Sequence, residues 1–128
     1  MKANFEEDFI NNFINKQYRN RLLFELKSSK KRINALMRFS HNIDDLIKKE
    51  KVSSKLKNFE ESELKSFLKE NKFYVLSFKH LEGCILEGND VLEYISEELS
   101  PVIVCGTNIA VLKKEFEKGT FNFYLLKK

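Results

Sequence analysis

The stretch Lys72-Phe73-Tyr74-Val75-Leu76-Ser77-Phe78 marks the point at which the sequence changes character. Before it, apolar residues recur at the three- and four-residue spacing of amphipathic helices. Within it, aromatic and β-branched residues follow one another as in a buried strand. We therefore expect an α+β fold, in which N-terminal helices pack on a small, mostly antiparallel C-terminal sheet with one intervening helix.

The length of 128 residues fits a single domain, with a helical part at 1–71 and an α+β part at 72–128. Apolar stripes at 5–14 and 18–26 predict helices, the first capped by Asn4. Their pattern leaves open whether they form one helix or two that meet near Asn15.

A third helix is expected over 30–39, with Ile33, Leu36 and Met37 on its buried face. The polar triplet after it predicts a break, and Asn42 is the expected cap of a further short helix. Polar, lysine-rich residues 48–58 are the best candidate for a linker, and a helix is expected over 60–70.

In the second part we expect strands at 73–78, 83–86 and 102–105, with a helix capped by Asn89 or Asp90 before the last of these. Residues 109–118 fit either a strand or a helix. A turn at Lys118-Gly119, followed by apolar residues 121–126, favours a hairpin with an irregular first strand.

The net charge of +4 is unevenly distributed. Residues 1–58 carry 14 basic and 7 acidic side chains, whereas residues 59–128 carry 9 and 12. The excess is sharpest over 16–38, where Glu25 is the only acid. This basic stripe fits phosphates, an anionic lipid surface or an acidic protein partner, but also a solvated helix face or neutralisation of the acidic second half. Its candidate binding residues are Arg19, Arg21, Lys27, Lys30, Lys31, Arg32 and Arg38.

Lys31 and Arg38 would share one face of the third helix with Ala35, which would allow joint phosphate contacts. If both cations are exposed, their replacement by Glu should change stability little. No established nucleic-acid-binding motif accompanies them, and Phe24 and Phe39 are expected in the core rather than as stacking platforms.

Few residues suit catalysis or metal binding. Neither Cys-x-x-Cys, His-Glu-x-x-His nor a glycine-rich phosphate loop occurs, so we expect no metal site and no cofactor. We expect Cys84 and Cys105 to be reduced, buried and not bonded to each other. His41 is expected to interact with carbonyls at a helix end. A thiol-dependent enzyme would use Cys105 with His41 or His80.

No apolar run exceeds four residues, which excludes a membrane-spanning segment, and the acidic start at 6–8 does not fit a signal peptide. We therefore expect a cytoplasmic protein without a membrane partner. The abundance of Lys, Asn, Ile and Phe is typical of an AT-rich bacterial genome. The sequence does not define the oligomeric state.

The chain resembles a group of small uncharacterised bacterial proteins in three segments. They are the helical run at 19–32, the segment Ala35-Leu36-Met37-Arg38-Phe39-Ser40-His41, and the expected strand at 73–77 with Leu81-Glu82-Gly83 after it. Relatives in that group often carry Asp-Gly in place of Glu82-Gly83. The resemblance covers most of the chain and implies a fold of helices followed by a sheet. It implies no activity and no site residues.

These features favour a non-catalytic binding module with an unidentified protein partner. A nucleic-acid-binding protein that uses the stripe at 16–38 is the first alternative, and a thiol-dependent enzyme is the second.

Overall fold

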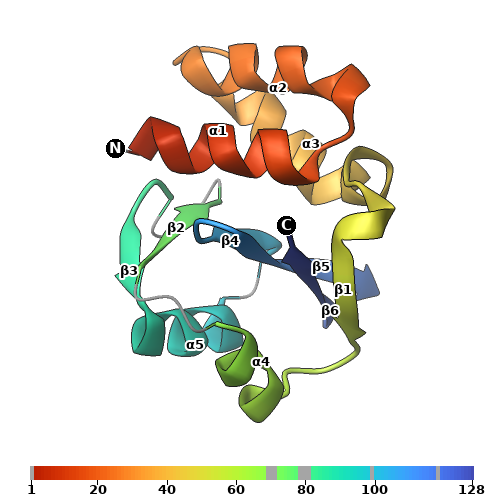
Figure 1. The fold of residues 1–128 in the computed structure, drawn as a ribbon, viewed down its shortest axis with the longest axis vertical. Helices are drawn as coiled ribbons and strands as arrows, with labels where there is room; N and C mark the ends of the chain where they lie inside the picture. The colour runs from red at the N-terminus through yellow and green to blue at the C-terminus, as the bar shows by residue number, and fades with distance from the viewer. Residues whose placement is uncertain (1, 69–71, 78–81, 99, 118) are drawn as a thin grey trace.

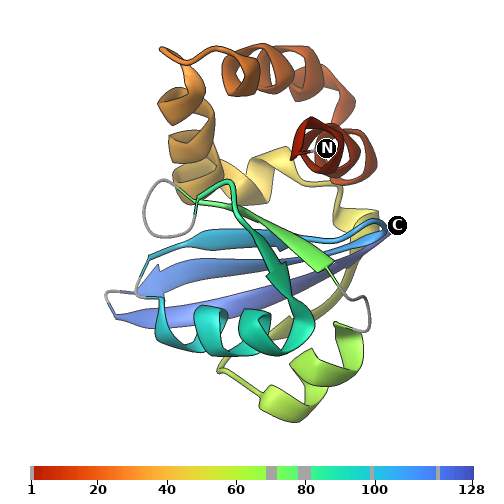
Figure 2. The ribbon, with the colours of Figure 1, turned by 90° about the vertical axis from the view of Figure 1, so that its left-hand side faces the viewer.

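The computed structural model describes residues 2–68, 72–77, 82–98, 100–117 and 119–128. They form three layers, with a sheet in the middle (Figures 1 and 2). One face of the sheet is covered by α1 (Lys2–Phe13), α2 (Lys16–Lys27) and α3 (Arg32–Leu46), and the other by α4 (Glu61–Phe67) and α5 (Gly88–Glu97). The expected α+β fold is confirmed.

The sheet is antiparallel throughout its described pairings. Its strands, in the spatial order β1-β6-β5-β4-β2-β3, are β1 (Val52–Leu56), β2 (Lys72–Leu76), β3 (Ile85–Glu87), β4 (Val102–Cys105), β5 (Ile109–Glu117) and β6 (Thr120–Lys127). The expected hairpin is β5 and β6, and the pairing shifts register between Glu115 and Glu117. Gly119 lies in the turn with φ +81°, a conformation that glycine adopts at little cost.

Alternation along the strands divides the buried residues into two cores. Tyr74 and Leu76 contribute to the core beneath α1–α3, whereas Phe73 and Val75 contribute to the core above α4 and α5. The period of two residues explains this division, because successive side chains of a strand point to opposite faces of the sheet.

The first two helices are separate, and Asn15 fixes the bend between them. Its side-chain amide donates to the carbonyl oxygens of Asp45 (3.2 Å) and Ile47 (3.1 Å), and its backbone N–H donates to that of Leu46 at 2.7 Å. The end of α1 is therefore tied to the end of α3. Asn4 lies inside α1 and is not its cap, because the helix begins at Lys2.

The expected buried face of the third helix is wrong at two of its three residues, although Leu36 is buried as expected. Ile33 and Met37 are 47% and 46% exposed, whereas Ala35 is fully buried. The expected break is confirmed at Asn42, whose non-helical angles (φ −125°, ψ 23°) form a kink between two helical pieces of α3, the second of which ends at Leu46. The two pieces bury one continuous face, formed by Ala35, Leu36 and Phe39 before the kink and by Ile43 and Leu46 after it.

The expected linker at 48–58 is also wrong, because it contains β1, which pairs with β6 at the edge of the sheet. A short 3₁₀ turn, Lys49–Lys51, leads into it. A register shift between Val52 and Ser54 and the exposed Lys55 are devices that protect an edge strand from further pairing. The cap of α5 is Glu87 rather than Asn89 or Asp90, which lie in the first turn of the helix.

Lys113 joins the sheet to the C-terminus of α5. Its buried ammonium donates to the carbonyl oxygen of Ile95 at 2.6 Å and to that of Glu98. It also lies 4.6 Å from the ring centroid of Phe121. Burial lowers the pKa of Lys113 because it disfavours the charged ammonium. The carbonyl oxygens and the aromatic ring offset part of this cost.

Tyr94 of α5 predicts a loss of stability at alkaline pH. Burial raises the pKa of its hydroxyl from 10.0 to about 12. Between these values the unfolded chain releases a proton that the folded protein keeps, so stability falls as pH rises. Urea unfolding between pH ~9 and ~11 should show this fall in the wild type and a shallower one in Tyr94→Phe. Equal slopes in the two proteins would contradict the assignment.

Candidate functional site

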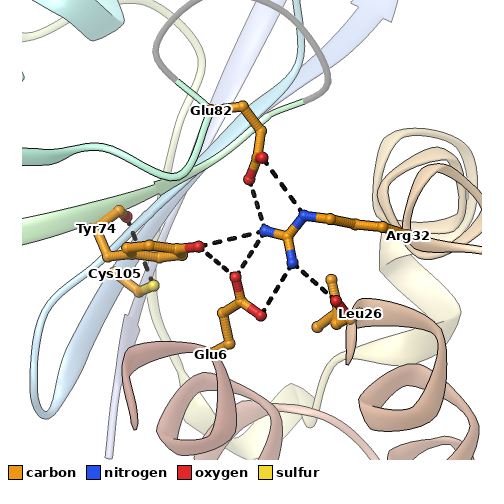
Figure 3. Close-up of polar contacts among 6 residues, drawn as sticks. All are labelled: Glu6, Leu26, Arg32, Tyr74, Glu82 and Cys105. Carbon is orange, nitrogen blue, oxygen red and sulfur yellow. Dashed lines mark hydrogen bonds and ion pairs between the residues drawn. The ribbon is translucent and has the colours of Figure 1, made fainter. Parts of the chain in front are cut away.

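Arg32, one of the predicted binding residues, lies at the centre of an internal polar cluster (Figure 3). Its Nη1 and Nη2 donate to the two carboxylate oxygens of Glu6 at 3.1 and 2.6 Å. Nη2 and Nε also donate to the carboxylate of Glu82, at 2.7 and 3.4 Å. The remaining contacts are to the carbonyl oxygen of Leu26 at 2.9 Å and the hydroxyl of Tyr74 at 3.2 Å.

The members of this cluster come from four parts of the chain. Glu6 lies on α1, Arg32 opens α3, Tyr74 lies on β2, and Glu82 belongs to the turn that leads back towards β3. Gly83 in that turn has φ +79°, and its N–H donates to the carbonyl oxygen of Val75 at 2.9 Å. The Glu-Gly pair thus supplies both the turn and the carboxylate that faces Arg32.

The electrostatics of the cluster favour a charged guanidinium and a neutral phenol. The hydrogen bonds from Arg32 to Glu6 raise the pKa of the guanidinium, and burial only partly opposes them. Burial and the hydrogen bond donated to Glu6 both raise the pKa of the Tyr74 hydroxyl. One cation and two carboxylates give a formal charge of −1, so the cluster is not suited to bind an external anion.

Two other predicted binding residues also form internal contacts. Arg38 donates from Nε and Nη2 to the two oxygens of Glu25 at 3.0 and 3.2 Å. Glu25 is 4% exposed, so this fork neutralises a buried carboxylate. Arg19 donates to the carbonyl oxygen of Ile14 at 2.9 Å. Arg38 is half-buried rather than exposed, so the condition for a small change in stability does not hold. Replacing Lys31 and Arg38 by Glu is now expected to lower stability, because it places a second carboxylate beside Glu25.

The remaining four predicted residues, Arg21, Lys27, Lys30 and Lys31, are exposed on α2 and the turn after it. With Phe24, which is 60% exposed, they form what we call the α2 basic face. The Lys31 ammonium lies 5.1 Å from the ring centroid of Phe24. Figure 2 shows α2 as the helix farthest from the sheet. Phe24 was expected in the core and is not there.

A cleft of about 300 Å³ lies between α2 and α3, beside this face. It is lined by Tyr18, Arg21, Leu22, Arg38, Asn42, Asp45 and Leu46. Arg21 and Arg38 line it together because both reach the carboxylate of Glu25, Arg21 from Nε at 3.6 Å.

The residues considered for catalysis are scattered. Cys105 is fully buried, its thiol donates to the carbonyl oxygen of Tyr74 at 3.6 Å, and neither cysteine forms a disulfide. Cys84 is only half-buried, contrary to expectation. His41 is exposed and lies directly before the kink of α3 at Asn42, and His80 lies outside the described residues. Within the described part of the chain, no group of three or more His, Cys, Asp and Glu residues could hold a metal ion.

Sequence reasoning missed Glu6, Tyr74 and Glu82 as partners of Arg32. The sequence feature that comes closest to indicating this cluster is the Glu82-Gly83 pair, which also belongs to the resemblance described above.

No helix among the described residues is long and apolar enough to cross a bilayer. The chain matches no known family, no curated protein and no solved structure. The resemblance to the small bacterial group stays a prediction.

Arg32→Ala should destabilise the protein by about 2–4 kcal/mol, because it leaves the Glu6 and Glu82 carboxylates without their cation. This is less than for a fully buried pair, since Arg32 is 25% exposed. Lys30→Ala is the matched control and should change the free energy of unfolding by less than about 0.5 kcal/mol. Equal effects of the two variants in urea unfolding would show that the cluster does not hold the layers together.

The two thiols should differ in reactivity. A maleimide should modify Cys84 in the native protein, whereas Cys105 should react only after unfolding. Mass spectrometry should therefore show one adduct under native conditions and two in denaturant. Two rapid adducts in the native state would contradict the burial of Cys105.

Proposed function

We propose that the chain is a non-catalytic binding module of the bacterial cytoplasm that recognises an acidic segment of a partner protein. The observation that carries this proposal is the α2 basic face, which keeps its cations at the surface while Arg19, Arg32 and Arg38 are used inside the fold.

The chemistry of the α2 basic face supports an acidic partner that also carries apolar side chains. Phe24 offers an exposed ring, and the cations around it complement carboxylates. An apolar centre with a charged rim is the usual arrangement of a protein interface. Because α2 is the outermost helix, a partner can approach it without displacing another element (Figure 2).

Nucleic acid suits this face less well. Lys27 is paired with Glu7 at 3.2 Å, and Arg21 with Glu25 at 3.6 Å, so half of its four cations have carboxylate neighbours. Duplex binding draws its affinity from many phosphate contacts. Single-strand binding uses several stacking rings, whereas this face has one, and that ring already lies beneath Lys31. The buried Cys105 likewise gives no support to a thiol-dependent enzyme.

The test uses a fluorescein-labelled peptide that alternates acidic residues with leucine and phenylalanine. The double variant Lys27→Glu/Lys31→Glu should bind it at least ~10-fold more weakly than the wild type, because two attractive contacts become repulsive. Phe24→Ala should also weaken binding. Lys65→Glu, an exposed change on α4 across the sheet, is the control and should bind like the wild type.

A labelled DNA duplex and a single-stranded RNA of similar length complete the experiment. If either binds more tightly than the peptide, with a steep loss of affinity as salt rises, the nucleic-acid alternative replaces this proposal. Equal peptide binding by the wild type and the double variant would also overturn it, since the α2 basic face would then not be the contact surface.

A further inference from the structure

The cleft between α2 and α3 has charges of opposite sign and an apolar wall. We propose that it binds a zwitterionic α-amino acid with an apolar side chain, with the carboxylate on Arg21 and Arg38 and the ammonium on Asp45. This site goes beyond the contact with an acidic protein proposed above: it shares Arg21 with the α2 basic face but takes a different ligand.

The carboxylate end is defined by two guanidinium groups that share one internal acid. Glu25 occupies Nε and Nη2 of Arg38, and it faces Nε of Arg21 at 3.6 Å. Two cations around one carboxylate leave a local charge of +1. No described residue accepts a hydrogen bond from Nη1 of Arg38, and Arg21 is 67% exposed. Their remaining N–H groups can hold a second carboxylate as a planar fork.

The ammonium end is Asp45, which lies near the C-terminus of α3. Its backbone carbonyl accepts from Asn15, but its carboxylate makes neither an ion pair nor a hydrogen bond to any residue in the described ranges. Asp45, Arg21 and Arg38 nevertheless line one cleft. Two arginines, Glu25 and Asp45 cancel in charge, so a zwitterion fits better than a simple anion.

The apolar wall is formed by Leu22, Leu46 and the half-buried Tyr18. Asn42 adds a side-chain amide at the point where α3 departs from helical geometry. The volume of about 300 Å³ is at the small end of ligand pockets, which suits a single amino acid better than a nucleotide or a folded peptide.

The probe is L-phenylalanine, titrated into the full chain and followed by NMR chemical shifts and calorimetry. Two analogues each remove one charge: L-phenylalaninamide lacks the carboxylate, and N-acetyl-L-phenylalanine lacks the ammonium. Both should bind at least ~10-fold more weakly than the parent amino acid. L-leucine should bind, and glycine should not saturate the site, because glycine has no side chain for the apolar wall.

Arg21→Gln and Asp45→Asn should each weaken L-phenylalanine binding at least ~10-fold, whereas Lys65→Gln on α4 should leave it unchanged. Thermal unfolding should confirm that the variants fold. Arg38 is left intact because its removal would leave the buried carboxylate of Glu25 without its two hydrogen bonds from the guanidinium. Asp45→Asn also separates the two proposals, since it should not weaken the acidic peptide and should abolish most amino-acid binding.

Three results would overturn the assignment. The first is no saturable binding of L-phenylalanine or L-leucine up to about 10 mM, a concentration at which a site of millimolar affinity would be nearly full. The second is N-acetyl-L-phenylalanine binding as well as the parent, which would make the site a carboxylate site alone. The third is wild-type affinity in folded Asp45→Asn. Acidic-peptide binding that persists in any of these cases would leave the proposed function standing.

Discussion

The guanidinium of Arg32 joins the helical layer to the sheet through direct polar contacts with both. A single planar group with five N–H donors meets acceptors from α1, α2, β2 and the turn at Glu82. Partial removal of this charge from water is costly, and the two carboxylates offset the cost only while all of these segments are in place. The cluster therefore favours one arrangement of the layers over others with equally good apolar contacts.

The same constraint divides the basic residues by chemistry. Within the basic stripe, arginine stands at the positions that donate inside the fold: Arg32 and Arg38 each meet two or more acceptor oxygens, and Arg19 meets one carbonyl oxygen. Where the side chain extends into solvent, at positions 27, 30 and 31, it carries lysine. The basic stripe is thus two sets of residues: one organises the fold, and the other is available to a partner.

Most of the fold could be predicted because its signals are local. The aromatic and β-branched residues at 73–76 and the apolar run at 102–105 indicate strands whatever lies beside them. β1 could not be predicted, since Val52-Ser53-Ser54-Lys55-Leu56 has no clear alternation and is a strand through its pairing with β6, some 70 residues away. The phase of α3 was missed for a similar reason: Ala35 is buried by the elements packed around it. The partners of Arg32 lie 26 and 50 residues away, and no spacing rule connects them.

Arg21 is the exception to the division between arginine and lysine. It is 67% exposed, and its one described ion pair is a 3.6 Å contact to a carboxylate that Arg38 already holds with two hydrogen bonds. A lysine could supply the same charge to Glu25. What lysine lacks is a second edge of donors directed away from that pair, which is the feature that a ligand carboxylate in the α2–α3 cleft would use. Arg21→Lys should therefore keep the stability of the fold and still weaken binding of an amino acid, a combination that a purely structural role for Arg21 does not produce.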